Sequence, residues 1–197
     1  MQIFLSKEYN AVVIGVSSGG LLALETILPQ LPADYAAAVL VVQHLSPDAD
    51  DFFVKHLNKK THLVVKEAED KEKALPGIVY MAPPNYHLMV EADRTLTLSA
   101  DERVNFSRPS IDVLFETAAE AYQEKVIGVI LTGANNDGAA GLKKIKELGG
   151  LTVVQSPDSA EADTMPKAAL DAVDADFVVP LTRMGRFLAT LVGGDEA

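Results

Sequence analysis

Three residues with catalytic side chains follow apolar, strand-like runs in this sequence. Ser17 comes after "AVVIGV", His44 comes after "AVLVVQ", and Asp137 lies shortly after "VIGVILTG". A serine hydroxyl becomes an effective nucleophile when a neutral imidazole accepts its proton and a carboxylate orients that imidazole. The carboxyl ends of parallel strands meet at one edge of a sheet, where ligands bind. Ser17, His44 and Asp137 are therefore candidates for the nucleophile, the base and the orienting acid of a hydrolase.

The turn after the first run, "GVSSGG" at residues 15–20, permits two interpretations. A glycine-rich turn before a helix suits a nucleophile elbow, because free helix N–H groups can stabilise an oxyanion. It is also typical of a phosphate or dinucleotide site. The turn lacks the G-x-G-x-x-G spacing and a P-loop lysine, and His44 stands where a ribose-binding acid would end the second strand. Both residues also have a non-catalytic explanation. His44 could be a hydrogen-bonded structural residue at a strand end, and Asp137 could be a helix cap or a turn residue.

Apolar runs rich in valine and isoleucine alternate with helical patterns along the chain. Strands are predicted at 11–16, 38–43, 62–67, 78–82, 126–132, 151–155 and 176–180. Helices are predicted at 20–30, 49–58, 109–125, 139–148 and 184–192. The alternation predicts an α/β fold with a doubly wound, mainly parallel sheet and helices on both faces. The stretch "HLMVEADRTLTLSADERV" adds one β-hairpin insertion.

Composition and charge exclude several classes of protein. The chain has 197 residues, is 48% hydrophobic and contains no cysteine, so we expect a single domain over 1–197 without disulfides or thiolate metal sites. It has no apolar stretch of the roughly 20 residues that cross a bilayer, and no secretory signal pattern. The expected location is cytoplasmic, without membrane insertion. A net charge of −11 argues against nucleic-acid binding. The sequence predicts no cofactor and no metal site.

Six motifs, in order, are similar to the catalytic domain of the chemotaxis protein-glutamate methylesterases, the CheB family. They are "IGVSSGG", "VVQHLSP", "YMAPPNYH", "RPSIDVLF", "GVILTGANNDGAAGL" and "TMPKAAL", and the similarity runs from about residue 10 to 182. The resemblance implies hydrolysis of glutamyl methyl esters, and deamidation of glutamines, on a methylated chemoreceptor or sensor-kinase signalling region. It assigns the nucleophile to Ser17, the base to His44 and the orienting carboxylate to Asp137.

The resemblance also implies contacts around this trio. Residues expected near the oxyanion or the substrate are Ser18, Gly19, Ala134, Asn135, His87, Arg103 and Arg108. His87 is a rival candidate for the base, with a structural or substrate-contact role as its alternative. Ala134-Asn135 stands where the family usually has Met-Gly, which changes an apolar substrate contact but retains the backbone N–H, and Ser18 stands where many members have threonine.

Only ten residues precede the first predicted strand, so no receiver domain lies before it in this chain. If the chain is complete, a regulator must act in trans. Two other functions stay open. One is a catalytically weak adaptor or binding protein of the same fold in a signalling complex, and the other is a nucleotide or phosphate binder that uses the glycine-rich turn.

Overall fold

The computed structural model describes residues 8–46, 48 and 50–193. Seven strands form a parallel sheet in the order β3-β4-β2-β1-β7-β8-β9. They are Ala11–Val16 (β1), Ala38–Gln43 (β2), Val64–Glu67 (β3), Ile78–Met81 (β4), Val126–Ile130 (β7), Leu151–Gln155 (β8) and Phe177–Val179 (β9). The strands His87–Val90 (β5) and Leu96–Ser99 (β6) pair antiparallel as a separate hairpin. The predicted doubly wound sheet with one hairpin insertion is confirmed.

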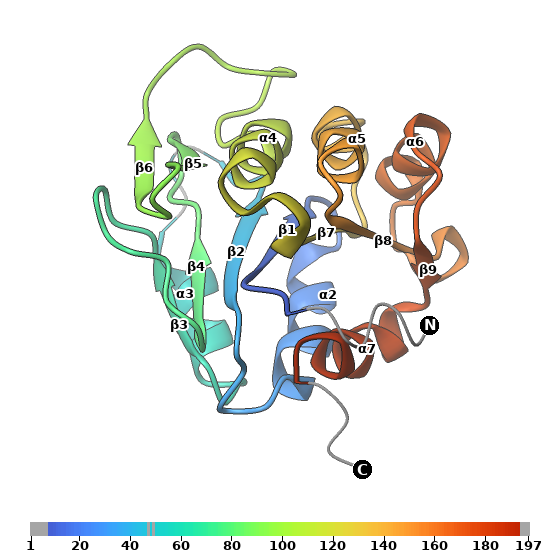
Figure 1. The fold of residues 1–197 in the computed structure, drawn as a ribbon, viewed down its shortest axis with the longest axis horizontal. Coiled ribbons are helices and arrows are strands. Elements are labelled where there is room, and N and C mark those ends of the chain that lie inside the picture. Colours follow the sequence, from blue (N-terminus) through green and yellow to red (C-terminus); the bar gives the residue numbers. More distant parts are fainter. Residues whose placement is uncertain (1–7, 47, 49, 194–197) are drawn as a thin grey trace.

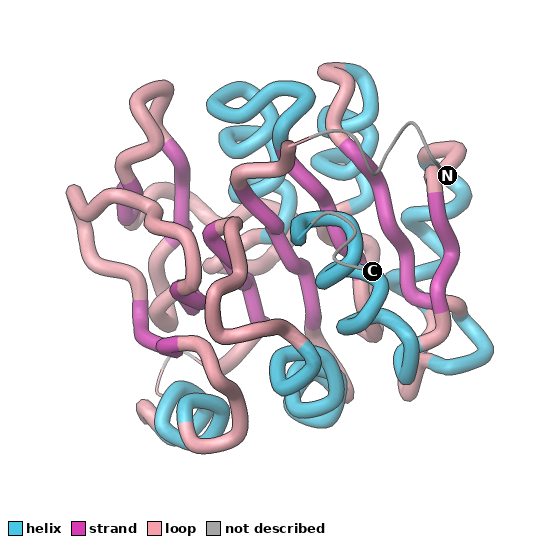
Figure 2. The backbone as a smooth tube through the Cα atoms, turned by 60° about the horizontal axis from the view of Figure 1, so that its bottom comes forward, coloured by secondary structure: helices cyan, strands magenta, loops and turns pink. Residues whose placement is uncertain are grey.

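Helices cover both faces of the sheet (Figures 1 and 2). On one face lie α4 (Ile111–Tyr122), α5 (Ala139–Glu147) and α6 (Thr164–Ala172). On the other lie α2 (Gly20–Ile27), α3 (Phe52–Asn58) and α7 (Leu181–Gly193). Short 3-10 turns occupy Leu28–Gln30, Gln123–Lys125 and Pro157–Ser159. The hairpin packs beside α4, where Val90 N donates to Thr117 Oγ1 at 3.2 Å.

Strand β1 contributes to two separate hydrophobic cores. Val12, Ile14 and Val16 pack in the core under α2 and α7. Ala11 and Val13 pack in the core under α4 and α5. Successive side chains of a strand point to opposite faces, and a parallel sheet covered on both faces buries all of them. The uninterrupted apolar run of β1 is the sequence signature of this double burial.

Helix α6 was not among the predicted helices. Its sequence, "TMPKAALDA", contains Pro166, and a proline in a helix interior removes a hydrogen bond and breaks the helix. Pro166 lies only two residues after Thr164, in the first turn, where backbone N–H groups have no partner within the helix anyway. The helix predicted at 49–58 begins at Phe52, and residue 49 lies outside the described residues.

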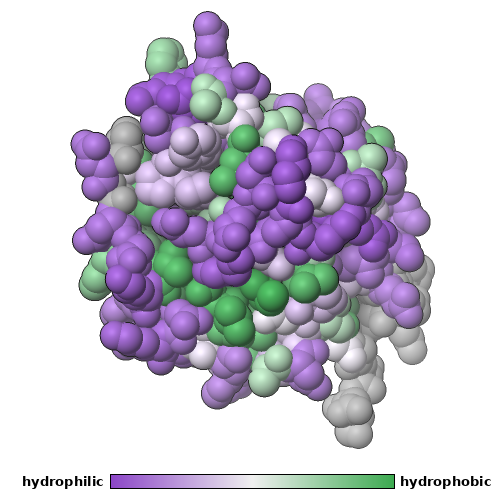
Figure 3. Space-filling view, turned by 90° about the vertical axis from the view of Figure 1, so that its left-hand side faces the viewer, coloured by the Kyte–Doolittle hydropathy of each residue, from purple (hydrophilic) through white to green (hydrophobic). Residues whose placement is uncertain are grey.

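The side of the molecule that carries the edge strand β3 is largely hydrophilic, with a band of hydrophobic residues across it (Figure 3). Val64 on β3 and Leu75 in the following connection are exposed hydrophobic residues of this part of the chain. No helix within the described part of the chain has the length and hydropathy that crossing a bilayer requires.

The strand order decides which loops meet at the carboxyl edge of the sheet. Strand β1 lies between β2 and β7, and Gly15 pairs with Val42 on one side and Ile130 on the other. The chain therefore leaves β1, β2 and β7 at neighbouring positions. The crossover from β1 leads to β2 on one side, whereas the crossover from β7 leads to β8 on the other, which makes this the topological switch point where open α/β sheets bind ligands.

Candidate active site

Ser17 begins the turn between β1 and α2, and its backbone is fixed from two sides. Its N–H donates to Thr132 O at 3.0 Å, and its carbonyl accepts from Gln43 Nε2 at 3.0 Å. Gly133 packs so closely that an added Cβ would lie 3.0 Å from Ser17 Cβ. Gly19 has a φ of 79°, a left-handed conformation that glycine adopts without strain. These glycines allow the sharp turn that presents the Ser17 hydroxyl.

His44 follows β2 and bridges the other two residues of the predicted trio. Its Nδ1 lies 3.2 Å from Ser17 Oγ, and its Nε2 lies 2.9 Å from Asp137 Oδ2. An ionised carboxylate only accepts hydrogen bonds, so Nε2 carries the imidazole proton and Nδ1 presents its lone pair to Ser17. The arrangement lets a proton pass from the Ser17 hydroxyl to His44 while Asp137 stabilises the resulting positive charge.

Asp137 lies after β7, is buried, and accepts hydrogen bonds on both carboxylate oxygens. Besides His44, its donors are Ser110 Oγ (2.8 Å), Ile111 N (2.7 Å), Asp112 N (3.1 Å) and Asn105 Nδ2 (3.1 Å). Ile111 and Asp112 form the first turn of α4, whose free N–H groups and dipole favour an anion. The "RPSID" motif thus supplies the cradle that holds the triad carboxylate.

The pKa values of the neighbouring buried carboxyls of Asp137 and Asp112 are shifted in opposite directions. Burial raises the pKa of Asp137, but the hydrogen bonds from His44 and from the α4 backbone outweigh burial, so its pKa lies below the ordinary value. Burial, together with the charge of Asp137, raises the pKa of Asp112. Asn105 Nδ2 bridges the pair, since it donates to Asp112 Oδ2 at 2.7 Å as well as to Asp137. Asp137 is therefore the anionic partner that His44 requires.

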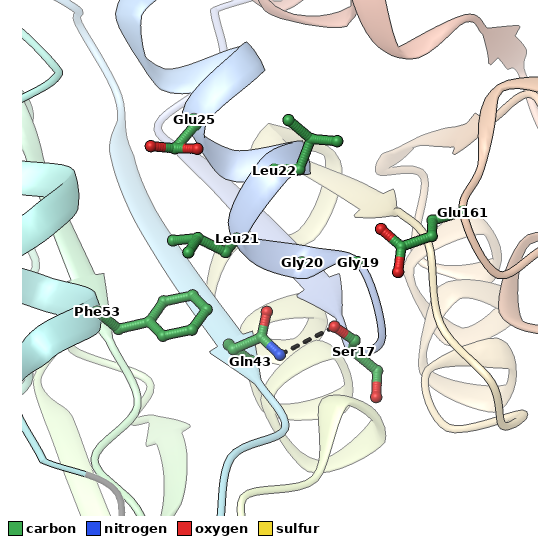
Figure 4. Close-up of a pocket in the computed structure, with 9 residues that line it drawn as sticks. All are labelled: Ser17, Gly19, Gly20, Leu21, Leu22, Glu25, Gln43, Phe53 and Glu161. Atoms are coloured by element: carbon green, nitrogen blue, oxygen red, sulfur yellow. Dashed lines mark hydrogen bonds between the residues drawn. The ribbon is translucent and has the colours of Figure 1, made fainter.

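Gln43, the last residue of β2, forms hydrogen bonds to both Ser17 and His44. Its Nε2 donates to the carbonyl oxygens of both Ser17 and His44, at 3.0 Å each (the bond to Ser17 is drawn in Figure 4). Its Oε1 is buried without a hydrogen-bond partner among the described residues. That oxygen packs against Gly20, where an added Cβ would lie 1.7 Å away. Sequence analysis gave Gln43 no role.

A cavity of about 400 Å³ opens beside Ser17 (Figure 4). Its apolar lining comes from Leu21 and Leu22 of α2 and Phe53 of α3, and its polar lining includes Glu25 and Glu161. The carboxylate of Glu25 is engaged by the His56 imidazole and lies 3.7 Å from Lys60 Nζ.

A smaller pocket of about 110 Å³ adjoins His44 and is lined by Arg103, Phe106 and Arg108, among others. The predicted substrate residue Arg108 is held by two connections of the chain. Its Nη1 donates to Ala100 O and Asp101 O of its own loop, and its Nη2 donates to Asn85 Oδ1, between β4 and β5, at 2.8 Å. Arg103 is exposed at this pocket.

His87 does not join the trio. It is 2% exposed on β5, its Nε2 lies 3.0 Å from Glu102 O, and its Nδ1 accepts from Ser110 N at 3.1 Å. Both ring nitrogens are therefore used to fix the hairpin to the start of α4. Of the roles expected for His87, the structure supports the structural one, because a ring this buried, with both nitrogens hydrogen-bonded, offers no free nitrogen to act as a base or to contact a substrate.

Asn135 contacts the base directly. Its Oδ1 accepts from Asp137 N at 3.0 Å, which turns its Nδ2 toward His44 Nδ1, 3.2 Å away. The Asn135 amide and the Ser17 hydroxyl thus share one lone pair. Sequence analysis placed Asn135 near the oxyanion or the substrate, and the structure adds a contact to the imidazole.

Three of the predicted oxyanion residues have free backbone donors. Within the described part of the chain, the N–H groups of Ser18, Gly19 and Ala134 donate no hydrogen bond. Ser18 is held close to the β7 loop, since Thr132 Oγ1 donates to Ser18 O at 2.8 Å. Free N–H groups of the turn after β1 and of the loop after β7 can donate hydrogen bonds that stabilise the negative charge on an attacked carbonyl oxygen.

A hydroxyl, an imidazole and a buried carboxylate in hydrogen-bond sequence, at the carboxyl edge of a doubly wound sheet, form the arrangement that serine hydrolases use. The family model of CheB methylesterase matches residues 12–188, so the chain belongs to this family. The Thermotoga maritima CheB methylesterase catalytic domain superposes with a TM-score of 0.90 at 36% identity, covering 94% of this chain and 100% of that one.

Relatives agree with this assignment. One from Leptospira interrogans is 54% identical over 184 residues, which cover 93% of this chain and 95% of the relative. A protein-glutamate methylesterase/protein-glutamine glutaminase of Archaeoglobus fulgidus is 42% identical over 173 residues, covering 86% of this chain and 50% of that protein. The predicted family, fold class and carboxylic ester hydrolase class are confirmed.

Proposed function

We propose that this chain hydrolyses glutamyl O5-methyl esters, and deamidates glutamines, in the signalling region of a chemoreceptor or sensor kinase. The observation that carries the proposal is the hydrogen-bond sequence from Ser17 through His44 to Asp137, with separations of 3.2 and 2.9 Å. The names of the relatives support the substrate class. A single catalytic domain over 1–197 and a cytoplasmic location belong to the same proposal.

The reaction follows from the proton positions. Ser17 Oγ attacks the γ-carbonyl carbon while His44 Nδ1 accepts the hydroxyl proton, and Asp137 stabilises the imidazolium through Nε2–H. The tetrahedral intermediate collapses, methanol leaves with the proton from Nδ1, and a glutamyl ester of Ser17 forms. Water then attacks this ester with His44 again as the base, which releases the glutamate carboxylate and restores Ser17.

The Ser18 and Ala134 N–H groups are the proposed oxyanion donors. Removal of one such donor typically costs about 100- to 1,000-fold in kcat. The Ala134 N–H is a backbone group, so it persists in this chain although the family's usual Met-Gly pair is replaced by Ala134-Asn135.

The substrate class is tested by methanol release from a chemoreceptor cytoplasmic fragment that carries glutamyl methyl esters. The wild-type chain is expected to release one methanol per ester, and ammonia from a matched fragment with glutamine at the same positions. A fragment with plain glutamate is the control. Tight binding of the esterified fragment without methanol release would contradict the proposal and favour the adaptor function.

The Asn135 contact predicts a change in pH dependence. The Asn135 amide N–H and the proton of the Ser17 hydroxyl compete for the same lone pair of His44 Nδ1. Asn135→Asp keeps the acceptor for Asp137 N but places an anion at Nδ1, and should move the acid limb of the pH–rate profile up by about one unit or more. Asn135→Ala, which loses both contacts, should move it less. Identical acid limbs in the three proteins would exclude any influence of Asn135 on the base.

A further inference from the structure

Phe106 is the most exposed large hydrophobic side chain among the described residues. It is 95% exposed, and the next, Leu22, is 59% exposed. A single exposed hydrophobic residue is ordinary in a protein surface. An almost fully exposed phenylalanine beside a catalytic pocket is not, and Phe106 lines the small pocket that adjoins His44.

The backbone that presents Phe106 is strained. Val104 and Ser107 exchange two backbone hydrogen bonds, of 3.1 and 2.9 Å, so residues 104–107 form a two-residue hairpin turn. Its central residues, Asn105 and Phe106, have φ of 50° and 62°. Turns with two positive φ values favour Asn-Gly, because a bulky side chain at the second position is disfavoured. The chain therefore holds a phenylalanine where folding alone favours glycine.

The turn is fixed to the catalytic residues rather than free in solvent. Asn105 Nδ2 donates to Asp112 Oδ2 at 2.7 Å and to Asp137 Oδ1 at 3.1 Å. The residue immediately before Phe106 is thus bonded to the carboxylate that orients His44. Phe106 stands at a set position relative to the reacting atoms, which suits a residue that aligns a substrate.

An apolar surface also lies beside Ser17. Leu21, Leu22 and Phe53 line the larger cavity, whereas Phe106 and Arg103 line the pocket at His44. The nucleophile and the base therefore have apolar side chains next to them from two different parts of the chain. A helix presents side chains three, four and seven residues apart on one face, so one helical face can offer a reactive glutamyl group and apolar neighbours together.

We propose that Phe106 docks the substrate by packing against an apolar side chain that shares a helical face with the target glutamyl ester. This inference rests on the proposed function, because it describes the side chains that surround the glutamyl ester in a substrate of the same site. Arg103, in the same pocket, adds a cation to a chain whose net charge is −11, which favours an acidic substrate segment at this place.

The test is a double-mutant cycle with helical peptides that each carry one glutamyl methyl ester. One series has a single leucine three, four or seven residues before or after the ester, and the matched series has alanine there. Wild type and Phe106→Ala are compared by methanol release. Phe106→Ala should lower kcat/KM about 10- to 100-fold more for one leucine peptide than for its alanine partner, mainly through KM. Equal losses for every pair would overturn the proposal.

A stability measurement separates docking from a structural role. Phe106→Gly restores the favoured Asn-Gly turn, so its midpoint of thermal unfolding should equal or exceed that of wild type by a few degrees, while the leucine preference is lost. A purely structural Phe106 would give a lower midpoint in both Phe106→Gly and Phe106→Ala. Val178→Ala, at an exposed valine of β9, is the matched control and should keep the leucine preference.

Binding distinguishes failure of this inference from failure of the proposed function. Affinities of the leucine and alanine peptides are also measured with a Ser17→Ala protein and with a Ser17→Ala, Phe106→Ala protein, neither of which turns over. A leucine preference in the first protein that is absent from the second supports docking whatever the enzyme's chemistry. Methanol release by wild type with no leucine preference in either protein would retain the methylesterase and reject the docking residue.

Discussion

Replacing Ser17 by alanine should lower kcat for methanol release by about 10⁵- to 10⁶-fold, because the nucleophile of a triad acts as one unit with its base. The fold should persist, since the bonds that fix this turn use the Ser17 N–H and carbonyl, which alanine retains. Circular dichroism and the thermal unfolding midpoint check the fold, and single-turnover methanol release checks the chemistry.

Ser18→Ala, in the same turn, is the matched control, and its loss should stay below about tenfold because the backbone N–H proposed for the oxyanion is unchanged. If Ser17→Ala retained a tenth of the wild-type rate, another group would have to be the nucleophile. The hydrogen-bonded geometry around His44 would then need a different explanation.

Asp137→Asn is expected to lower kcat by about 10⁴-fold, as loss of the orienting carboxylate does in triads of this kind. An amide offers one acceptor and one donor to a cradle that contains only donors. If its Nδ2 faces His44, Nε2 must become the acceptor and the proton moves to Nδ1, where it blocks transfer from Ser17. Asp112→Asn, at the neighbouring buried carboxyl, should cost far less. Similar losses in the two variants would show that the buried pair matters for folding rather than for orienting the base.

The Asp137→Asn variant should also change how the free energy of unfolding depends on pH. The pKa of Asp137 is lowered in the folded protein, so its contribution to the free energy of unfolding is complete above the unfolded value of about 4 and is lost as pH falls through the folded value. Denaturant unfolding should therefore show the largest difference between wild type and Asp137→Asn near pH 6–7, shrinking toward pH 3. A constant difference across this range would mean that the carboxylate is not stabilised by its charge.

The trio could be predicted because Ser17 and His44 follow buried strands directly and Asp137 lies in the loop after a third, and strand ends are set by the apolar pattern. The residues that support it were harder to find. Asn105 and Ser110 reach Asp137 through side-chain bonds that span 32 and 27 residues. No local pattern encodes such contacts, although the sequence "RPSID" before a helix marks a helix start that can bind an anion.

His87 could not be placed from the sequence alone. The motif "YMAPPNYH" puts it a few residues after a predicted strand, but it is the first residue of β5, which belongs to the hairpin and not to the parallel sheet. Its buried ring is bonded to the start of α4 instead. The exposure of Phe106 was equally beyond sequence reasoning, since it depends on two consecutive positive φ values.

The amide of Gln43 has one more consequence. It holds the carbonyls of Ser17 and His44 together, and the Ser17 hydroxyl and the His44 imidazole lie 3.2 Å apart. The protein's own hydrogen bonds thus fix the two strand ends relative to each other, and the favourable contacts of an arriving helix can act on positioning the ester. Evolution could exchange the surrounding loops, and with them the recognised protein, while the reaction itself stayed intact.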